Sequence, residues 1–81
     1  MRVELATSML RAAADGQEAV ELNATTIREL YADLTRQYPR FQTLTNKGVA
    51  IAINGRIFQD DWNTPIPADA ELVLLPYIEG G

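Results

Sequence analysis

The residues of this chain that could do chemistry are Gly80 and Gly81, its last two positions, which follow an apolar run over residues 72–75. Glycine has no Cβ and allows φ of either sign, so another protein can close tightly around a glycine backbone. The α-carboxylate of Gly81 would be the reacting group, and Gly80 would let the chain thread into a narrow channel. We therefore expect the chemistry of this protein to take place on the carboxylate of Gly81.

The rest of the composition excludes most other kinds of catalytic site. The chain has 81 residues and contains neither histidine nor cysteine. It therefore lacks the commonest general base, the thiol nucleophile and nearly every transition-metal ligand set. A domain of this size is also too small to bury an elaborate catalytic cleft. We expect no metal site and no catalytic activity in the chain itself.

Charge and hydropathy limit the classes of binding partner that this chain could have. The net charge is −4 without clustered Lys or Arg, whereas binding to a nucleic-acid backbone needs a basic patch. Lys47, the only lysine, is predicted to lie in a solvated turn beside Gly48, with a modification site as the alternative. No apolar run approaches the length of a membrane span, and no signal peptide is recognisable. We expect a cytoplasmic protein that binds neither nucleic acid nor membrane.

The elements that must position the tail begin with two strands. Period-2 alternation over residues 2–6 and a weaker alternation over residues 17–22 predict an antiparallel pair. The segment between them, residues 7–14, has helical propensity but stops at Asp15-Gly16 after barely two turns. So short a helix is unstable alone, so we expect a loop with one helical turn.

The main helix is predicted over residues 26–38. Thr26 and Glu29 have the spacing of a capping box, and Pro39 forbids continuation. The apolar side chains recur at helical spacing and form one stripe that faces the core, namely Ile27, Leu30, Tyr31, Leu34 and Tyr38.

Residues 49–58 predict a β-hairpin around Asn54-Gly55, a pair typical of a type I′ turn. The resulting register places Ala52 opposite Ile57, and a last strand is predicted over residues 71–77. If that strand lies beside the hairpin, one face of the sheet carries an exposed apolar patch that would bind a partner: Ala50, Ala52, Ile57, Val73 and Leu75. Glu79, beside the tip, would contact a basic entrance on that partner.

The loop that follows the hairpin carries Asp60, Asp61 and Trp62. The adjacent carboxylates are interpreted as loop solvation, and Trp62 is expected to cover the edge of the core. In an alternative reading, this loop covers part of the apolar patch.

The order strand, strand, helix, hairpin, strand resembles the ubiquitin-like β-grasp fold, an α+β fold with a mixed sheet of four to five strands packed on one main helix. The sequence is similar to the molybdopterin and thiamine sulfur carriers, and within them to the small subunit of molybdopterin synthase. Residues 1–76 would form the globular domain and residues 77–81 a flexible tail. One departure is Ala68-Asp69-Ala70-Glu71, where the family usually has Asp-Gly-Asp-Glu. The similarity is carried by Leu10-Arg11, Ile53-Asn54-Gly55, Pro65-Ile66 and residues 71–81.

The resemblance implies a mechanism in which the chain is a non-catalytic sulfur donor. An activating enzyme that uses ATP and Mg²⁺ would adenylate the carboxylate of Gly81, which would then become a thiocarboxylate. The large catalytic subunit of a synthase would take the sulfur for molybdopterin. Two alternatives stay open at this point. A ubiquitin-like modifier would share the adenylation step, and the carboxylate of a plain β-grasp interaction module would never be activated.

Overall fold

The computed structural model describes residues 1–76, and the predicted tail of residues 77–81 lies outside this range. The described residues form one five-stranded sheet with strand order β2-β1-β5-β3-β4. β1 and β5 are parallel, and the other neighbouring pairs are antiparallel. The elements are, in chain order, β1 (Arg2–Leu5), α1 (Ser8–Ala13), β2 (Ala19–Glu21), α2 (Ile27–Gln37), α3 (Phe41–Lys47), β3 (Val49–Ile53), β4 (Arg56–Phe58) and β5 (Leu72–Pro76).

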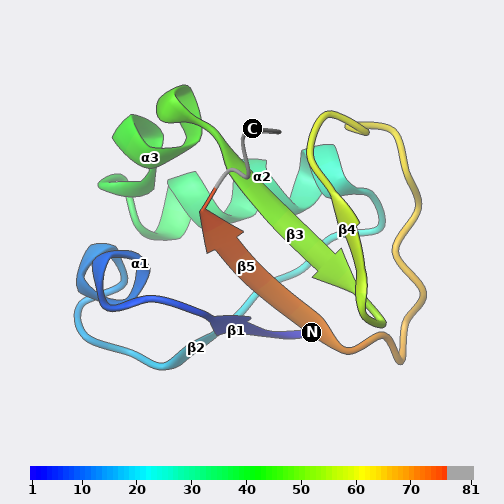
Figure 1. Ribbon diagram of the computed structural model, residues 1–81, viewed down its shortest axis with the longest axis horizontal. Helices are drawn as coiled ribbons and strands as arrows, with labels where there is room; N and C mark the ends of the chain where they lie inside the picture. Colours follow the sequence, from blue (N-terminus) through cyan, green and yellow to red (C-terminus); the bar gives the residue numbers. More distant parts are fainter. Residues whose placement is uncertain (77–81) are drawn as a thin grey trace.

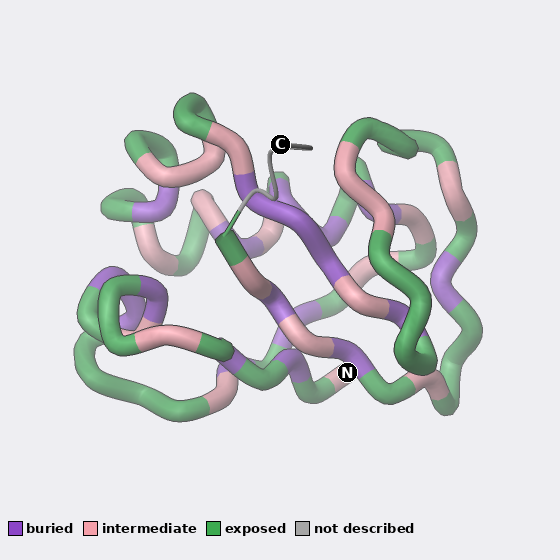
Figure 2. The backbone as a smooth tube through the Cα atoms, viewed as in Figure 1, coloured by how far each residue is buried: buried purple, intermediate pink, exposed green. Residues whose placement is uncertain are grey.

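The core lies between the sheet and α2. Figure 1 shows α2 across the back of the sheet, with α1 and α3 at one end of it. In β1, Val3 and Leu5 are buried while Arg2 and Glu4 are exposed, and β5 likewise alternates with Leu72 and Leu74 buried. This alternation is visible along the strands in Figure 2. The predicted mixed sheet packed on one main helix is confirmed.

The first helix corrects the sequence prediction. We expected residues 7–14 to form a loop with one helical turn, but Ser8–Ala13 is an α-helix. Thr7 caps it, since its side chain accepts a hydrogen bond from the Leu10 N–H. Leu10 is buried in the core, and Asp15, with φ of 59°, follows the end of the helix. Packing supplies the stability that so short a helix lacks by itself.

The second correction is α3, which the sequence reading did not predict. Pro39 ends α2 as expected, but the chain turns back into a helix at Phe41, whose side chain is fully buried. Phe41 and Leu44 have helical spacing, and this short signal was missed. Lys47 is therefore the last residue of a helix, followed by Gly48 with φ of 109°.

The cap of α2 has one detail that the spacing alone does not give. Thr26 Oγ1 accepts from the Glu29 N–H at 3.2 Å, as a capping box requires. The Glu29 carboxylate also accepts from the N–H and the hydroxyl of Thr25, at 2.8 and 2.7 Å. Thr26 forms an isolated β-bridge with Pro65. The hydrogen bond from the Thr25 side chain is the main reason why the pKa of Glu29 is lowered.

The hairpin has the predicted register. Ala52 pairs with Ile57, and Ile53 pairs with Arg56. Asn54 and Gly55 have φ of 52° and 84°, the positive values that a type I′ turn requires. The turn therefore fixes which side chains of β3 and β4 face away from the helix.

Candidate functional site

The strand that leads to the glycine pair lies in the middle of the sheet. β5 pairs with β1 on one side and with β3 on the other, and its last residue, Pro76, lies opposite Val49. Gly80, Gly81 and Glu79 themselves lie outside the described residues. The structure shows where the chain leaves the sheet. It does so at the end of β5, a strand that is hydrogen-bonded to a neighbouring strand on each side.

The face of the sheet turned away from α2 carries an apolar patch. Ala52 pairs with Ile57 on β4 and with Val73 on β5, so these three residues form a row across three strands. Ile57 is 47% exposed, and Ala52, Val73 and Leu75 are half-buried. We call these four residues the apolar patch. β5 thus lies beside the hairpin, which is the condition on which the predicted patch depended.

Ala50 does not contribute to this surface. It was predicted to be an exposed member of the patch, but it is fully buried. Ala50 pairs with Leu75, and a single methyl group on a central strand is too short to reach solvent between larger neighbours. Strand parity gives the face on which a side chain lies, whereas the exposure also depends on its length.

A carboxylate borders the apolar patch. Glu4 on β1 pairs with Val73 and is exposed, so the apolar part of the row ends at a charged side chain. The cation–π contact between Arg56 and Phe58, with 5.2 Å from the guanidinium to the ring centre, lies on the opposite face of β4. Both residues pair with buried core residues of β3, Ile53 and Ile51. An exposed apolar area with a polar rim is typical of a protein-binding surface.

The Trp62 loop covers the helix side of the molecule. The Trp62 ring packs edge-on against Tyr31 of α2, with centroids 5.2 Å apart and planes at 70°, and the Trp62 carbonyl accepts from the Arg28 N–H at 2.8 Å. The expectation that Trp62 covers the edge of the core is confirmed. The alternative, in which this loop covers the apolar patch, is wrong.

Tyr31, on which Trp62 packs, is buried and has a structural role. The Tyr31 hydroxyl donates to the Val49 carbonyl at 3.5 Å. Burial, with the charge of Asp60 as a smaller cause, raises the pKa of Tyr31. The phenol therefore stays neutral at physiological pH, and its role is to join α2 to the start of β3.

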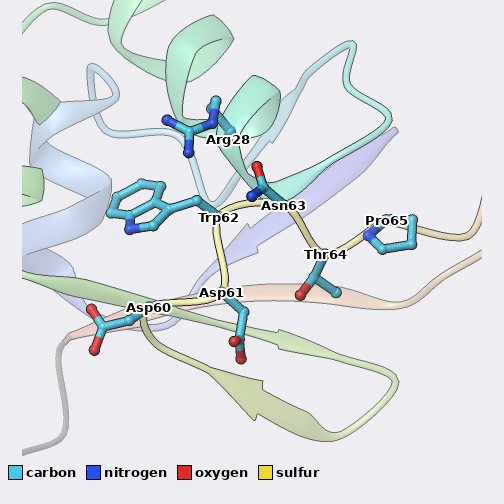
Figure 3. A pocket seen from close by; sticks show the side chains of 7 residues that line it. All are labelled: Arg28, Asp60, Asp61, Trp62, Asn63, Thr64 and Pro65. Atoms are coloured by element: carbon cyan, nitrogen blue, oxygen red, sulfur yellow. The ribbon is translucent and has the colours of Figure 1, made fainter.

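A depression of about 480 Å³ lies along the same loop. Figure 3 shows the Arg28 and Trp62 side chains close together on one side of it, while the carboxylates of Asp60 and Asp61 point to the other side. Within residues 1–76, no three acidic side chains come together as metal ligands. The loop thus offers a polar surface without the ligand set of a metal centre.

A second cavity, of about 220 Å³, lies where α1, α3 and the end of β5 meet. Its lining includes Leu10, Leu44, Lys47 and Pro76, together with Met9, which is 61% exposed. The sequence reading missed this cavity, because its residues come from three segments and α3 was not predicted. The lysine and the last described residue of β5 therefore border one space.

Comparison with known proteins agrees with this geometry. The structure resembles a chain of the BexX/CysO complex of Amycolatopsis orientalis, with a TM-score of 0.75 and 19% identity over 99% of this chain and 98% of that one. For CysO of Mycobacterium tuberculosis the TM-score is 0.75 and the sequence identity 22%, with 95% of this chain and 98% of that chain covered. For the small archaeal modifier protein 1 of Methanosarcina acetivorans the TM-score is 0.74 and the identity 23%, with 99% of this chain and 94% of that chain covered. The fold is thus the ubiquitin-like β-grasp.

The sequence itself identifies the family. The sequence model of the ThiS family matches residues 5–81, so this chain belongs to the ThiS family and is a small ubiquitin-like protein of the sulfur-carrier type. A comparison with curated protein sequences gives no match. In the described part of the chain, no helix combines the length and apolar composition needed to cross a bilayer.

Proposed function

We propose that this protein carries sulfur on the carboxylate of Gly81. The observation that supports this most is the extent of the family match, which continues past the end of β5 through the glycine pair. An ionised carboxylate is a poor electrophile at neutral pH. It must first attack the α-phosphorus of ATP, releasing pyrophosphate and forming an acyl-adenylate. A sulfur nucleophile then displaces AMP and leaves a thiocarboxylate.

The ATP and its Mg²⁺ belong to the activating enzyme in this proposal. This chain contributes the length of its tail and a tip without bulky side chains. Five residues separate Pro76 from Gly81, and a fully extended segment of that length spans roughly 17 Å. Gly81 brings its carbonyl carbon without side-chain shielding, and Gly80 lets the backbone pass through a tight channel. The body can therefore remain outside while the tip enters a buried active site.

The body docks through the apolar patch in this proposal. Leu75 immediately precedes Pro76, so a partner seated on the patch lies next to the origin of the tail. Both the activating enzyme and the large subunit of a synthase would use this face, and Glu79 would contact a basic entrance. The resemblance of the sequence to the small subunit of molybdopterin synthase favours molybdopterin as the recipient of the sulfur.

Removing Gly81 tests the proposal directly. The truncated chain should fold normally and lose adenylation, measured as pyrophosphate exchange with the activating enzyme of the same host. Trp62 fluorescence reports folding, because this ring packs on Tyr31. Normal exchange by the truncated chain would refute the proposal. Intact mass of the native protein should show a second species, heavier by the difference between sulfur and oxygen.

A protein modifier is the second candidate function, and its support is the similarity of the fold to an archaeal modifier protein. A modifier would pass the activated Gly81 to lysines of other proteins. An immunoblot under denaturing conditions would then show a ladder of larger adducts, whereas a carrier gives one band.

The recipient of the sulfur is tested by deleting the gene that encodes this protein. The deletion should abolish molybdenum-cofactor content while thiamine synthesis continues.

A further inference from the structure

The chain is poor in amines. Lys47 is the only lysine among seven basic residues, and the others are arginines. A guanidinium group stays protonated in proteins and does not attack acyl groups. A lysine amine, once deprotonated, is a competent nucleophile toward an activated carbonyl. Lys47 therefore provides the only side-chain amine with which this protein could react with its own activated end.

The amine of Met1 is placed differently. It donates to the Leu22 carbonyl at 2.7 Å and lies 2.8 Å from the Glu21 carboxylate. Because β1 and β5 run parallel, with Val3 opposite Leu72, Met1 lies at the end of the sheet where β5 begins. The chain leaves β5 at the opposite end, so this amine is both engaged and distant from Pro76.

Lys47 lies at the end of the sheet from which the tail departs. It is exposed at the end of α3, two residues before Val49, and Val49 pairs with Pro76. Figure 1 shows the start of β3 beside the arrowhead of β5. Lys47 and Pro76 also line the same cavity of about 220 Å³. Five residues, with a reach of roughly 17 Å, can bring Gly81 back to this cavity.

We propose that Lys47 is an intramolecular acceptor for the activated tail, an inference that rests on the proposed activation of Gly81. The neutral Nζ attacks the carbonyl carbon of Gly81. The C–N bond forms, the C–O bond to AMP breaks, AMP leaves with the electron pair, and the nitrogen releases a proton to water. The product is a closed ring with an isopeptide bond between Lys47 and Gly81, and no redox partner is needed.

The same chain is favoured over a second copy as the acceptor. A short tether between two reacting groups gives an effective concentration of about millimolar, which exceeds the micromolar concentration of a typical protein solution. Ring closure therefore competes with sulfur transfer whenever an adenylated tail leaves the activating enzyme before a sulfur donor reacts. The closed ring cannot be activated again, so the reaction withdraws carrier from the cycle when sulfur is scarce.

The experiment uses the full chain with its activating enzyme, ATP and Mg²⁺, without a sulfur donor. The expected product is a monomer lighter by one water. Trypsin should leave Lys47 uncut and yield residues 41–56 joined to residues 57–81. Lys47→Arg is the matched variant, because it keeps the charge and removes the nucleophile. It should give normal pyrophosphate exchange without the lighter product.

A second arm makes the inference testable without the enzyme. The full chain is prepared with Gly81 as a thioester of a small thiol, and Lys47 should displace that thiol to give the same ring, whereas Lys47→Arg should only hydrolyse. Absence of the ring from the wild-type thioester, joining of two copies through Lys47, or ring formation at another residue would each overturn the inference. Loss of pyrophosphate exchange would count against the proposed function instead, and the thioester arm would still decide on Lys47.

Discussion

Placing a charge in the apolar patch should separate partner binding from folding, and Ile57→Asp is the clearest case. Ile57 is 47% exposed in the free protein. Full burial of an isoleucine side chain contributes about 1.5–3 kcal/mol, so a half-exposed one gives about 1 kcal/mol. We expect the free energy of unfolding to fall by about that amount, measured by urea denaturation with Trp62 fluorescence.

Binding should suffer more than folding. A charge at the centre of an apolar contact costs about 2 kcal/mol or more, which corresponds to roughly a 30-fold weaker complex at about 1.4 kcal/mol per tenfold change. The measurement is isothermal titration against the activating enzyme. Leu75→Asp, next to the origin of the tail, should behave in the same way.

The matched control is Ala32→Asp, which adds the same charge on the exposed face of α2, away from the sheet. It should change neither the affinity nor, beyond about 0.5 kcal/mol of helix propensity, the stability. If Ile57→Asp binds as tightly as the wild type, the apolar patch is not the docking surface. If Ala32→Asp weakens binding equally, net charge rather than surface contact explains the effect.

Three further predictions concern the tail, one turn and one cap. Gly80→Val should leave the melting temperature unchanged but lower kcat/KM for adenylation by about 100-fold, since a β-branched side chain would misplace the tip in a tight channel; equal rates would contradict tail threading. Gly55→Ala should cost about 1–2 kcal/mol in urea denaturation because φ is 84°, although a Cβ there meets no atom within 4 Å. The pKa of Glu29 is lowered in the folded state, so its contribution to stability is present above its ordinary value of 4.5 and is lost as the pH falls below it. Urea midpoints of Glu29→Gln should therefore fall less between pH 6 and pH 3 than those of the wild type, and identical pH profiles would contradict this assignment.

The parts of the fold that the sequence predicts correctly are those with local signals. Asn54-Gly55 fixes the hairpin register, and alternation along β1 separates buried from exposed residues. The turn also places Ile57 opposite Ala52, whereas the pairing of Ala52 with Val73 joins distant segments and is known only from the structure. Register and parity are properties of neighbouring residues, so a single sequence contains them.

The parts that the sequence did not give depend on packing between distant segments. The helix at Ser8–Ala13 is stable because Leu10 reaches the core. Ala50 is buried because of the length of its neighbours, and its own position in the pattern does not show this. The cavity between Lys47 and Pro76 exists only once α1, α3 and β5 are assembled.

The central position of β5 connects docking to delivery. A tail that leaves from an edge strand could fray back along the sheet, whereas β5 is paired on both sides up to Leu74 and with β3 as far as Pro76. A partner that holds Leu75 and Val73 therefore also fixes where the tail begins. With that origin fixed, a short segment searches only a small volume, and its tip reaches an effective concentration of about millimolar in the partner's active site. A modest affinity at the apolar patch is then enough for efficient activation, and release after each step stays fast. The same short tether makes Lys47 a competitor for the activated tip whenever no partner holds it.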